Sequence, residues 1–194
     1  MNMQLRLWTA SIALCSLLLP FVARATTVDP VSFEEMVRSS QRIFVGEVIS
    51  VQSFRADAAG ALRIRTRVTF RAGESLLGAG PLVVLEFRGG TVGDLTEQIA
   101  GMPEFAVGDQ YVVFAHDGGQ WVSPLVGFSQ GLFRVSRDAR DGTSRVLGYD
   151  GTPIASTSAV GRSAARVSAA ITIPMPLSAF VQAIEAELAK NPHR

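Results

Sequence analysis

The sequence predicts a mainly β domain, a small β-barrel or sandwich with a short helix at each end. Three observations predict this class. Short segments rich in β-branched and aromatic residues recur between residues 42 and 149. Turn residues, chiefly glycine with aspartate or proline, separate these segments. No long segment between them has the apolar spacing of a helix.

A short helix is expected directly before the first strand. Ser32 and Glu35 have the spacing of a capping box, in which the serine hydroxyl accepts a hydrogen bond from the third helical amide. Phe33, Met36 and Val37 would form the buried side of this helix.

Seven segments are expected as strands, and the second has the clearest pattern. They are residues 42–51, 62–71, 81–87, 110–115, 121–126, 132–136 and 145–149. In the second segment, mostly apolar residues alternate with mostly basic ones, with Thr66 on the first face and Thr69 on the second, which is typical of a half-buried antiparallel strand. Its apolar face would hold Leu62, Ile64, Val68 and Phe70, and its opposite face Arg63, Arg65, Arg67 and Arg71.

Residues 1–25 have the organisation of a secretory signal peptide. Arg6 precedes a mostly apolar stretch, and Ala23 and Ala25 supply the small residues that signal peptidase requires. The alternative is an N-terminal membrane anchor, but the apolar stretch is short for a span of about 20 residues. We expect cleavage after Ala25, no transmembrane segment in the remaining chain, and an exported protein that is periplasmic or extracellular.

Composition excludes several classes of function. Cleavage would remove two arginines and no acid, so the formal net charge changes from +1 to −1 and favours no nucleic-acid partner. Cys15 is the single cysteine, so the exported chain has no disulfide and no thiolate metal site. The two histidines, His116 and His193, are too few for a typical zinc site. We therefore expect no metal and no cofactor.

Residues 127–131 read GFSQG and match the G-x-S-x-G motif of serine hydrolases. That motif functions as a sharp turn between a strand and a helix, with an acid and a histidine following in the chain. The residues after Gly131 have a strand pattern, and the only later histidine is His193, close to the end of the chain. We therefore expect Ser129 to lie in a turn and not to be catalytic.

Gly89, Gly90 and Gly93 form the most glycine-rich segment. It lacks the Lys-Ser/Thr ending and the following helix of a phosphate-binding loop. We expect a flexible loop near the mouth of a barrel, and we keep these glycines as candidate binding-loop residues.

The chain divides into four parts. Residues 1–25 are the signal peptide, residues 26–150 the β-barrel domain, residues 151–176 a loosely ordered linker poor in large apolar residues, and residues 177–194 a C-terminal amphipathic helix capped by Ser178. One face of this helix would carry Phe180, Val181, Ile184 and Leu188. The helix either packs on the barrel or binds a partner.

Four stretches between residues 43 and 135, IFVGEVISV, TRVTFRAGESLLG, GMPEFAVGDQYVVFA and GFSQGLFRV, resemble a group of exported bacterial proteins. These are similar in pattern to netrin-like modules and tissue inhibitors of metalloproteinases. The resemblance implies an OB-like barrel of five or six strands. The inhibitors bind the protease zinc through an N-terminal cysteine, whereas this mature chain would begin at Thr26 and has no cysteine. The resemblance therefore does not carry that inhibitory mechanism to this chain.

These observations together predict an exported, non-catalytic binding module whose partner is a protein or an anionic polymer. Arg63, Arg65, Arg67 and Arg71 are its candidate binding residues, because guanidinium groups bind anions bidentately. The alternative for these arginines is a solvated face that protects an exposed strand. Two other functions stay open: an envelope-associated structural protein that docks through its terminal helix, and a serine hydrolase that uses Ser129.

Overall fold

The computed structural model describes residues 29–58, 61–117, 122–161 and 172–190, and a six-stranded antiparallel sheet dominates this part of the chain. The strand order is β3-β2-β1-β6-β7-β8. The strands are β1 (Arg42–Ala58), β2 (Ala61–Leu77), β3 (Leu82–Arg88), β6 (Gln110–Ala115), β7 (Leu132–Arg137) and β8 (Ser144–Gly148). A separate two-stranded sheet pairs β4 (Gly90–Val92) with β5 (Leu95–Glu97). The mainly β class is confirmed, and the signal peptide expected at residues 1–25 lies outside the described residues.

The large sheet is open, so the closed barrel that we expected is wrong. Closure would require a strand that pairs with the outer edge of β3 along its length. Within the described residues, that edge bonds to the backbone only at its last residue, where the Arg88 N–H donates to the Val122 carbonyl at 3.0 Å. The described part of the predicted strand 121–126 forms only an isolated bridge, between Leu125 and Ala115.

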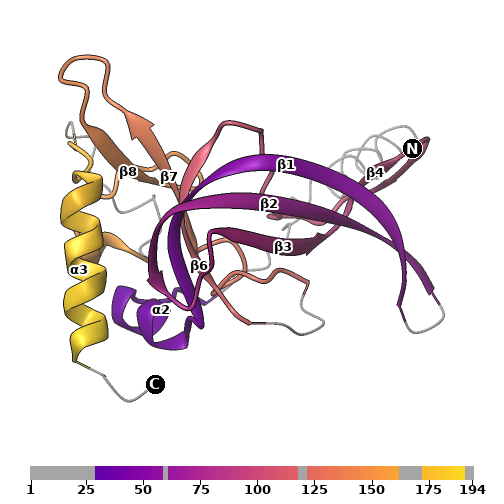
Figure 1. Cartoon of the computed structure of the whole chain (residues 1–194), viewed down its shortest axis with the longest axis horizontal. Helices are drawn as coiled ribbons and strands as arrows, with labels where there is room; N and C mark the ends of the chain where they lie inside the picture. The colour runs from indigo at the N-terminus through magenta and orange to yellow at the C-terminus, as the bar shows by residue number, and fades with distance from the viewer. Residues whose placement is uncertain (1–28, 59–60, 118–121, 162–171, 191–194) are drawn as a thin grey trace, which may run out of the picture.

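A long curved hairpin gives the sheet its shape. Strands β1 and β2 have 17 residues each, and Figure 1 shows them arching side by side with β3. Their register shifts at three places near the start of β1. Such bulges bend a strand and increase its twist. Gly46 lies at one of these shifts, where a Cβ atom would approach the Phe44 ring to 2.9 Å. The bent hairpin curls around one face of the sheet, which we call the inner face.

The inner face encloses one of two apolar clusters. This inner cluster contains Phe44, Val48, Val68, Phe70, Val83, Leu85, Phe87, Tyr111, Val113, Ala115, Leu125 and Leu132. Phe105, from the segment before β6, packs against it, with its ring centroid 4.8 Å from that of Phe87 and 5.7 Å from that of Tyr111. Residues from five of the six strands thus share one core, and the curled sheet needs no closure to bury it.

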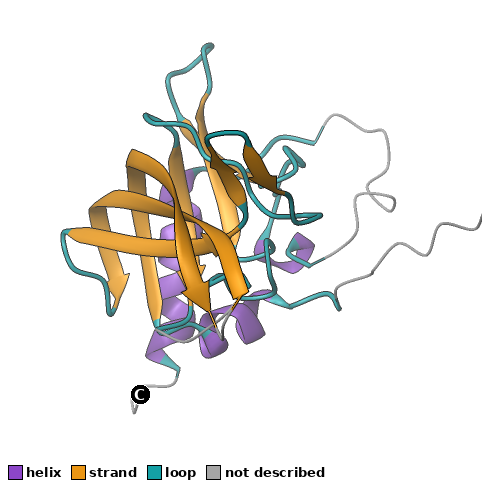
Figure 2. Cartoon of the chain, turned by 90° about the vertical axis from the view of Figure 1, so that its right-hand side faces the viewer, coloured by secondary structure: helices purple, strands orange, loops and turns teal. Residues whose placement is uncertain are grey.

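Two helices cover part of the opposite, outer face. They are α2 (Phe33–Ser39) and α3 (Leu177–Ala189), which Figure 2 shows along one side of the sheet. The outer cluster that they bury contains Phe33, Met36, Val37, Ile43, Val45, Val112, Phe114, Val126, Phe133, Val146, Ile154, Val160, Phe180, Val181 and Ile184. Among the described residues, no helix has the length and apolar content needed to cross a membrane.

The two helix predictions succeed in position and differ in detail. The Ser32 hydroxyl accepts from the Glu35 N–H at 3.2 Å, as predicted, but the Glu35 carboxylate pairs with Arg38 at 2.6 Å and does not complete the capping box. Helix α3 begins at Leu177 after a Pro176 N-cap, so Ser178 is not its cap. Pro176 has the extended conformation of an N-cap, with φ −61° and ψ 146°, and no side chain caps this helix.

The segment expected as a loosely ordered linker, residues 151–176, contributes to the core where it is described. Ile154 and Val160 are buried in the outer cluster. The Ile154 N–H donates to the Val146 carbonyl at 3.3 Å, and the Val146 N–H donates to the Met175 carbonyl at 3.1 Å. These bonds lie along the free side of β8, so the segment covers that edge of the sheet. Residues 162–171 lie outside the described part.

Candidate functional site

The four candidate arginines lie on one strand and one face. Every second residue of β2 faces the inner cluster, and three of these residues are buried: Ile64, Val68 and Phe70. The residues between them face the outer side, beyond the area that α2 and α3 cover, and include Arg63, Arg65, Arg67 and Arg71. We call these four the arginine stripe. Leu62 was expected on the buried face but is exposed, because it lies near the tip of the hairpin, beyond the inner cluster.

The members of the stripe differ in exposure. The side chains of Arg67 and Arg71 are 47% and 63% exposed, whereas that of Arg65 is 20% exposed. The Arg65 Nε is buried and makes no hydrogen bond within the described residues. The Arg67 guanidinium lies over the Phe54 ring, with its carbon 4.8 Å from the ring centroid, and this cation–π contact orients it on the face. Arg63 is exposed as well, near the hairpin tip, so Arg65 is the one member of the stripe that is largely covered.

Two glutamates from neighbouring strands partly neutralise the stripe. Glu86 of β3 accepts from Arg67 Nη2 at 2.8 Å and lies 3.6 Å from Arg65 Nε. Glu47 of β1 lies 3.7 Å from Arg71 Nη1. Four arginines and two glutamates leave an excess of two positive charges. Exposed ion pairs of this kind contribute little to stability, about 0–1 kcal/mol, so an anionic ligand can compete with the glutamates.

The glycine-rich segment forms a packed hairpin where we expected a flexible loop. Gly93 starts the two-residue turn between β4 and β5 with a φ of 59°. Gly90 has a φ of 126°, and a Cβ atom there would collide with the hydroxyl oxygens of Ser53 and Thr66. Gly89 and Gly90 thus allow β4 to approach β1 and β2 closely. Their geometry accounts for the glycines without a bound phosphate.

Glu97 of β5 holds this hairpin against the large sheet. Its carboxylate accepts from the Ile64 N–H at 2.9 Å and from Arg88 Nε at 2.7 Å. The hydrogen bond from the Ile64 backbone, followed by that from Arg88, lowers the pKa of Glu97 below its usual range. The charged form of Glu97 is thus the one that the fold uses, at the end of the arginine stripe nearest the hairpin tip.

Ser129 lies in a turn that leads into a strand. Gly127 and Phe128 have positive φ angles of 63° and 70°, and β7 begins at Leu132. The strand–turn–helix of a nucleophile elbow is therefore not formed. The turn has a structural partner instead, because the Gln130 side chain accepts from the Val31 N–H and donates to the Asp29 carbonyl, each at 2.9 Å. His193 lies outside the described residues.

Tyr111 connects the inner cluster to a polar group at the edge of β6. Its ring is fully buried, and its hydroxyl donates to Asp109 Oδ2 at 2.9 Å. Burial, together with this hydrogen bond, raises the pKa of Tyr111 to about 12. The described residues hold no group of three or more His, Cys, Asp or Glu side chains that could bind a metal ion.

Two surface grooves lie away from the stripe. A groove of about 530 Å³ separates α3 from β8 and is lined by residues that include Glu74, Gln182 and Glu185. A second, of about 480 Å³, lies at the end of α2 and is lined by Arg38, Ser39, Ser40, Gln41 and Leu77. Neither contains a member of the arginine stripe, which occupies an open face.

The comparisons with known proteins add no relative. No protein-family model matches the chain, and no curated protein and no solved structure gives a significant match.

The sequence predicts the arginines but misses the residues that accompany them. Glu47, Phe54 and Glu86 come from two other strands, and only the strand register places them beside Arg67 and Arg71. One signal was present in the sequence. In the predicted strand 81–87, Leu82, Val84 and Glu86 alternate with the buried residues, which assigns them to the outer face.

Proposed function

We propose that this protein is an exported, non-catalytic binding module that holds an anionic partner on the outer face of β2. The partner class is an anionic polymer or an acidic protein surface. One observation carries the proposal: Arg67 and Arg71 are exposed on the same face of one strand, and the four stripe arginines outnumber their two glutamate partners.

The spacing of the stripe suits a ligand with repeating charges. A strand rises about 3.3 Å per residue, so Arg67 and Arg71, four residues apart, lie about 13 Å apart and can each contact a separate sulfate or carboxylate of a polymer. Each guanidinium can donate two parallel hydrogen bonds to such a group. The neighbouring Phe54 ring fixes the orientation of Arg67 and reduces the entropy lost on binding.

Heparin tests this proposal as a sulfated polymer, with polyglutamate as a carboxylate polymer. We expect the full chain to bind heparin at low ionic strength and to lose affinity steeply at physiological ionic strength, because counterions screen exposed charges. Replacing Arg67→Ser and Arg71→Ser together should lower the affinity about tenfold, which corresponds to about 1.4 kcal/mol. Isothermal titration calorimetry at the two ionic strengths measures both effects.

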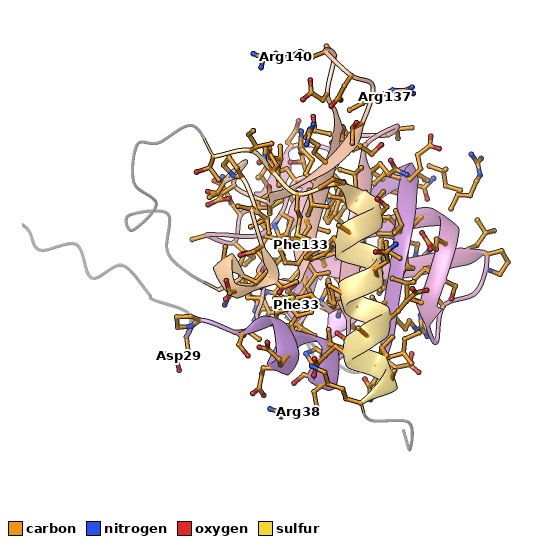
Figure 3. All side chains as sticks on the ribbon, turned by 90° about the vertical axis from the view of Figure 1, so that its left-hand side faces the viewer. Asp29, Phe33, Arg38, Phe133, Arg137 and Arg140 are labelled. Atoms are coloured by element: carbon orange, nitrogen blue, oxygen red, sulfur yellow. The ribbon has the colours of Figure 1, made fainter. Side chains whose placement is uncertain are left out.

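The matched control removes two other exposed arginines. Arg137 and Arg140 lie on the β7–β8 hairpin, and Figure 3 shows both side chains pointing into solvent at its tip. The double variant Arg137→Ser/Arg140→Ser has the same net charge as the stripe variant and should bind as the wild type does. Equal losses in both variants, or no binding by the wild type at either ionic strength, would refute the stripe as a binding site.

Export is a separate part of the proposal. If residues 1–25 are a signal peptide, mass spectrometry of the protein recovered outside the cytoplasm should show a chain that begins at Thr26. A membrane-bound species that retains these residues would instead identify them as an anchor.

The relationship to netrin-like modules also belongs to this proposal. The antiparallel strand order and the long β1–β2 hairpin are compatible with an opened OB-like arrangement. The resemblance names no partner for this chain, because its mature form would lack the cysteine that the metalloproteinase inhibitors use.

A further inference from the structure

The two edges of the large sheet are treated differently. Backbone segments around Ile154 and Met175 hydrogen-bond to the free side of β8, as described above. Strand β3 forms the other edge and has no such cover along Leu82–Glu86 within the described residues. An uncovered edge presents unpaired N–H and C=O groups that can accept another strand.

The strand register shows which groups are free. The Ala72 N–H donates to the Pro81 carbonyl at 2.9 Å, and the Gly89 N–H donates to the Ile64 carbonyl at 2.8 Å. In an antiparallel pair, alternate residues make these bonds, so Val83, Leu85 and Phe87 bond to β2. The residues between them direct their backbone groups away from β2. These residues are Leu82, Val84 and Glu86.

The free stretch is bounded at both ends. Strand β3 begins at Leu82, and the Pro81 carbonyl before it is already used by the Ala72 N–H of β2. At the other end, the Arg88 N–H already donates to the Val122 carbonyl. The free stretch therefore runs from Leu82 to Glu86, and Val84 is its centre. An antiparallel strand that pairs with it around Val84 meets no blocked position.

The free stretch also exposes apolar side chains. Leu82 is 60% exposed and Val84 is 46% exposed, and both lie on the outer face. Soluble proteins usually protect a β edge with charges, prolines or covering segments. Two exposed apolar side chains on an unpaired edge, one of them at its centre, form a surface that pairing with another chain would bury.

We propose that two copies of this chain pair through β3, antiparallel, about a two-fold axis at Val84. A two-fold contact uses the same surface on both copies and so must be self-complementary. Here Val84 faces Val84 of the second copy, and Leu82 faces Glu86 of the second copy. Each facing pair exchanges two backbone hydrogen bonds. The sheets of the two copies become continuous.

Charge complementarity favours a second copy as the occupant. Arg71 lies beside Leu82 in the β2–β3 register and is exposed. The two-fold pairing places Glu86 of the second copy on the other side of Leu82, in the same row of the outer face. Each copy thus brings an arginine toward a glutamate of the other, and symmetry makes this contact twice.

The pairing would extend the surface described above, although it does not depend on the proposed function. Strands β2 of the two copies would be separated only by the two β3 strands. Both arginine stripes would then lie on one continuous outer face, where a long polyanion could contact both.

Sedimentation equilibrium of the full chain tests the pairing. We expect a reversible monomer–dimer equilibrium that Val84→Lys shifts to monomer, because two lysines would then face each other at the axis. The matched control is Val107→Lys, since Val107 is also an exposed valine but lies in the segment before β6. This control should dimerise as the wild type does. The proposal would be overturned if the wild-type chain stayed monomeric at all concentrations tested. It would also be overturned if the Val84→Lys variant still formed dimers.

Disulfide trapping gives an independent test that does not require a destabilising charge. Cys15 is the only cysteine, so a Cys15→Ser background leaves no thiol. In that background, Val84→Cys should form a dimer with oxidised glutathione as oxidant. The Cα atoms of a hydrogen-bonded antiparallel pair lie about 5.5 Å apart, within the range of a disulfide. If the Val84→Cys variant cross-linked no faster than the Val107→Cys variant, this result would contradict the proposed two-fold axis at Val84.

Discussion

Replacing Phe180 by alanine is expected to lower the free energy of unfolding by about 3–5 kcal/mol, the usual cost of removing a buried phenylalanine. The side chain is fully buried where α3 meets the sheet. Its ring centroid lies 5.1 Å from that of Phe133 and 5.6 Å from that of Phe33. Figure 3 shows these two residues beside α3. Truncation would leave a cavity that α2, α3 and β7 share.

Urea denaturation measures this effect. The control is Gln182→Ala on the exposed side of the same helix, which should change stability by no more than about 0.5 kcal/mol. If Phe180→Ala costs as little as the control, α3 does not depend on the sheet for its place, and the alternative of a partner-binding helix becomes the better account.

The second large effect is expected at Gly131, the last residue of the GFSQG motif. A Cβ atom at this position would lie 2.7 Å from the Phe114 carbonyl oxygen and 2.9 Å from the Val126 carbonyl oxygen. Both oxygens already accept hydrogen bonds, the Phe114 carbonyl from the Val126 N–H at 3.0 Å and the Val126 carbonyl from the Gly131 N–H at 2.9 Å. Gly131→Ala should therefore cost about 1–3 kcal/mol, as overpacking does.

Ser129→Ala is the matched substitution within the same turn. It should leave the thermal midpoint within the small range of a surface change. Comparing Gly131→Ala with Ser129→Ala distinguishes two roles for this turn. A structural turn loses stability when its glycine is replaced, whereas a catalytic turn loses activity when its serine is replaced. Hydrolysis of a generic ester by the wild type but not by Ser129→Ala would reverse this interpretation.

The sequence pattern predicted correctly which residues of a single strand or helix share a face. The alternation over residues 62–71 placed the stripe arginines on the face opposite Ile64, Val68 and Phe70, and the structure confirms it. The spacing of Phe33, Met36 and Val37 likewise predicted the buried side of α2, which is confirmed. In both cases the periodicity of a single element decides which residues share a face.

The open sheet could not be predicted because strand pairing is not local. The apolar content of β3 is the same whether its outer edge is paired or free. The residues expected to form a further strand, 121–126, contain Pro124, which cannot donate a ladder hydrogen bond. Composition did not indicate that the described part of residues 151–176 packs on the sheet, because two apolar residues at the right positions, Ile154 and Val160, are enough to attach residues 151–161 to the core.

For the same reason, the arginines of the candidate site were predictable from the sequence, but their neighbours on other strands were not. The stripe belongs to one strand, whereas its environment depends on register. Glu86 lies opposite Arg67, and Glu47 lies opposite Arg71. The three bulges in the β1–β2 pair shift this register, and nothing in the sequence indicates where they fall. The free edge of β3 follows from the same pairing.

Arginine footprinting tests the central claim, that the outer face of β2 binds an anionic partner. Phenylglyoxal modifies exposed arginines, and mass spectrometry measures the extent at each one with and without heparin. Our account predicts that heparin protects Arg67 and Arg71 while Arg137 and Arg140 are modified to the same extent in both samples. Protection of Arg137 and Arg140 with Arg67 and Arg71 unprotected would contradict it.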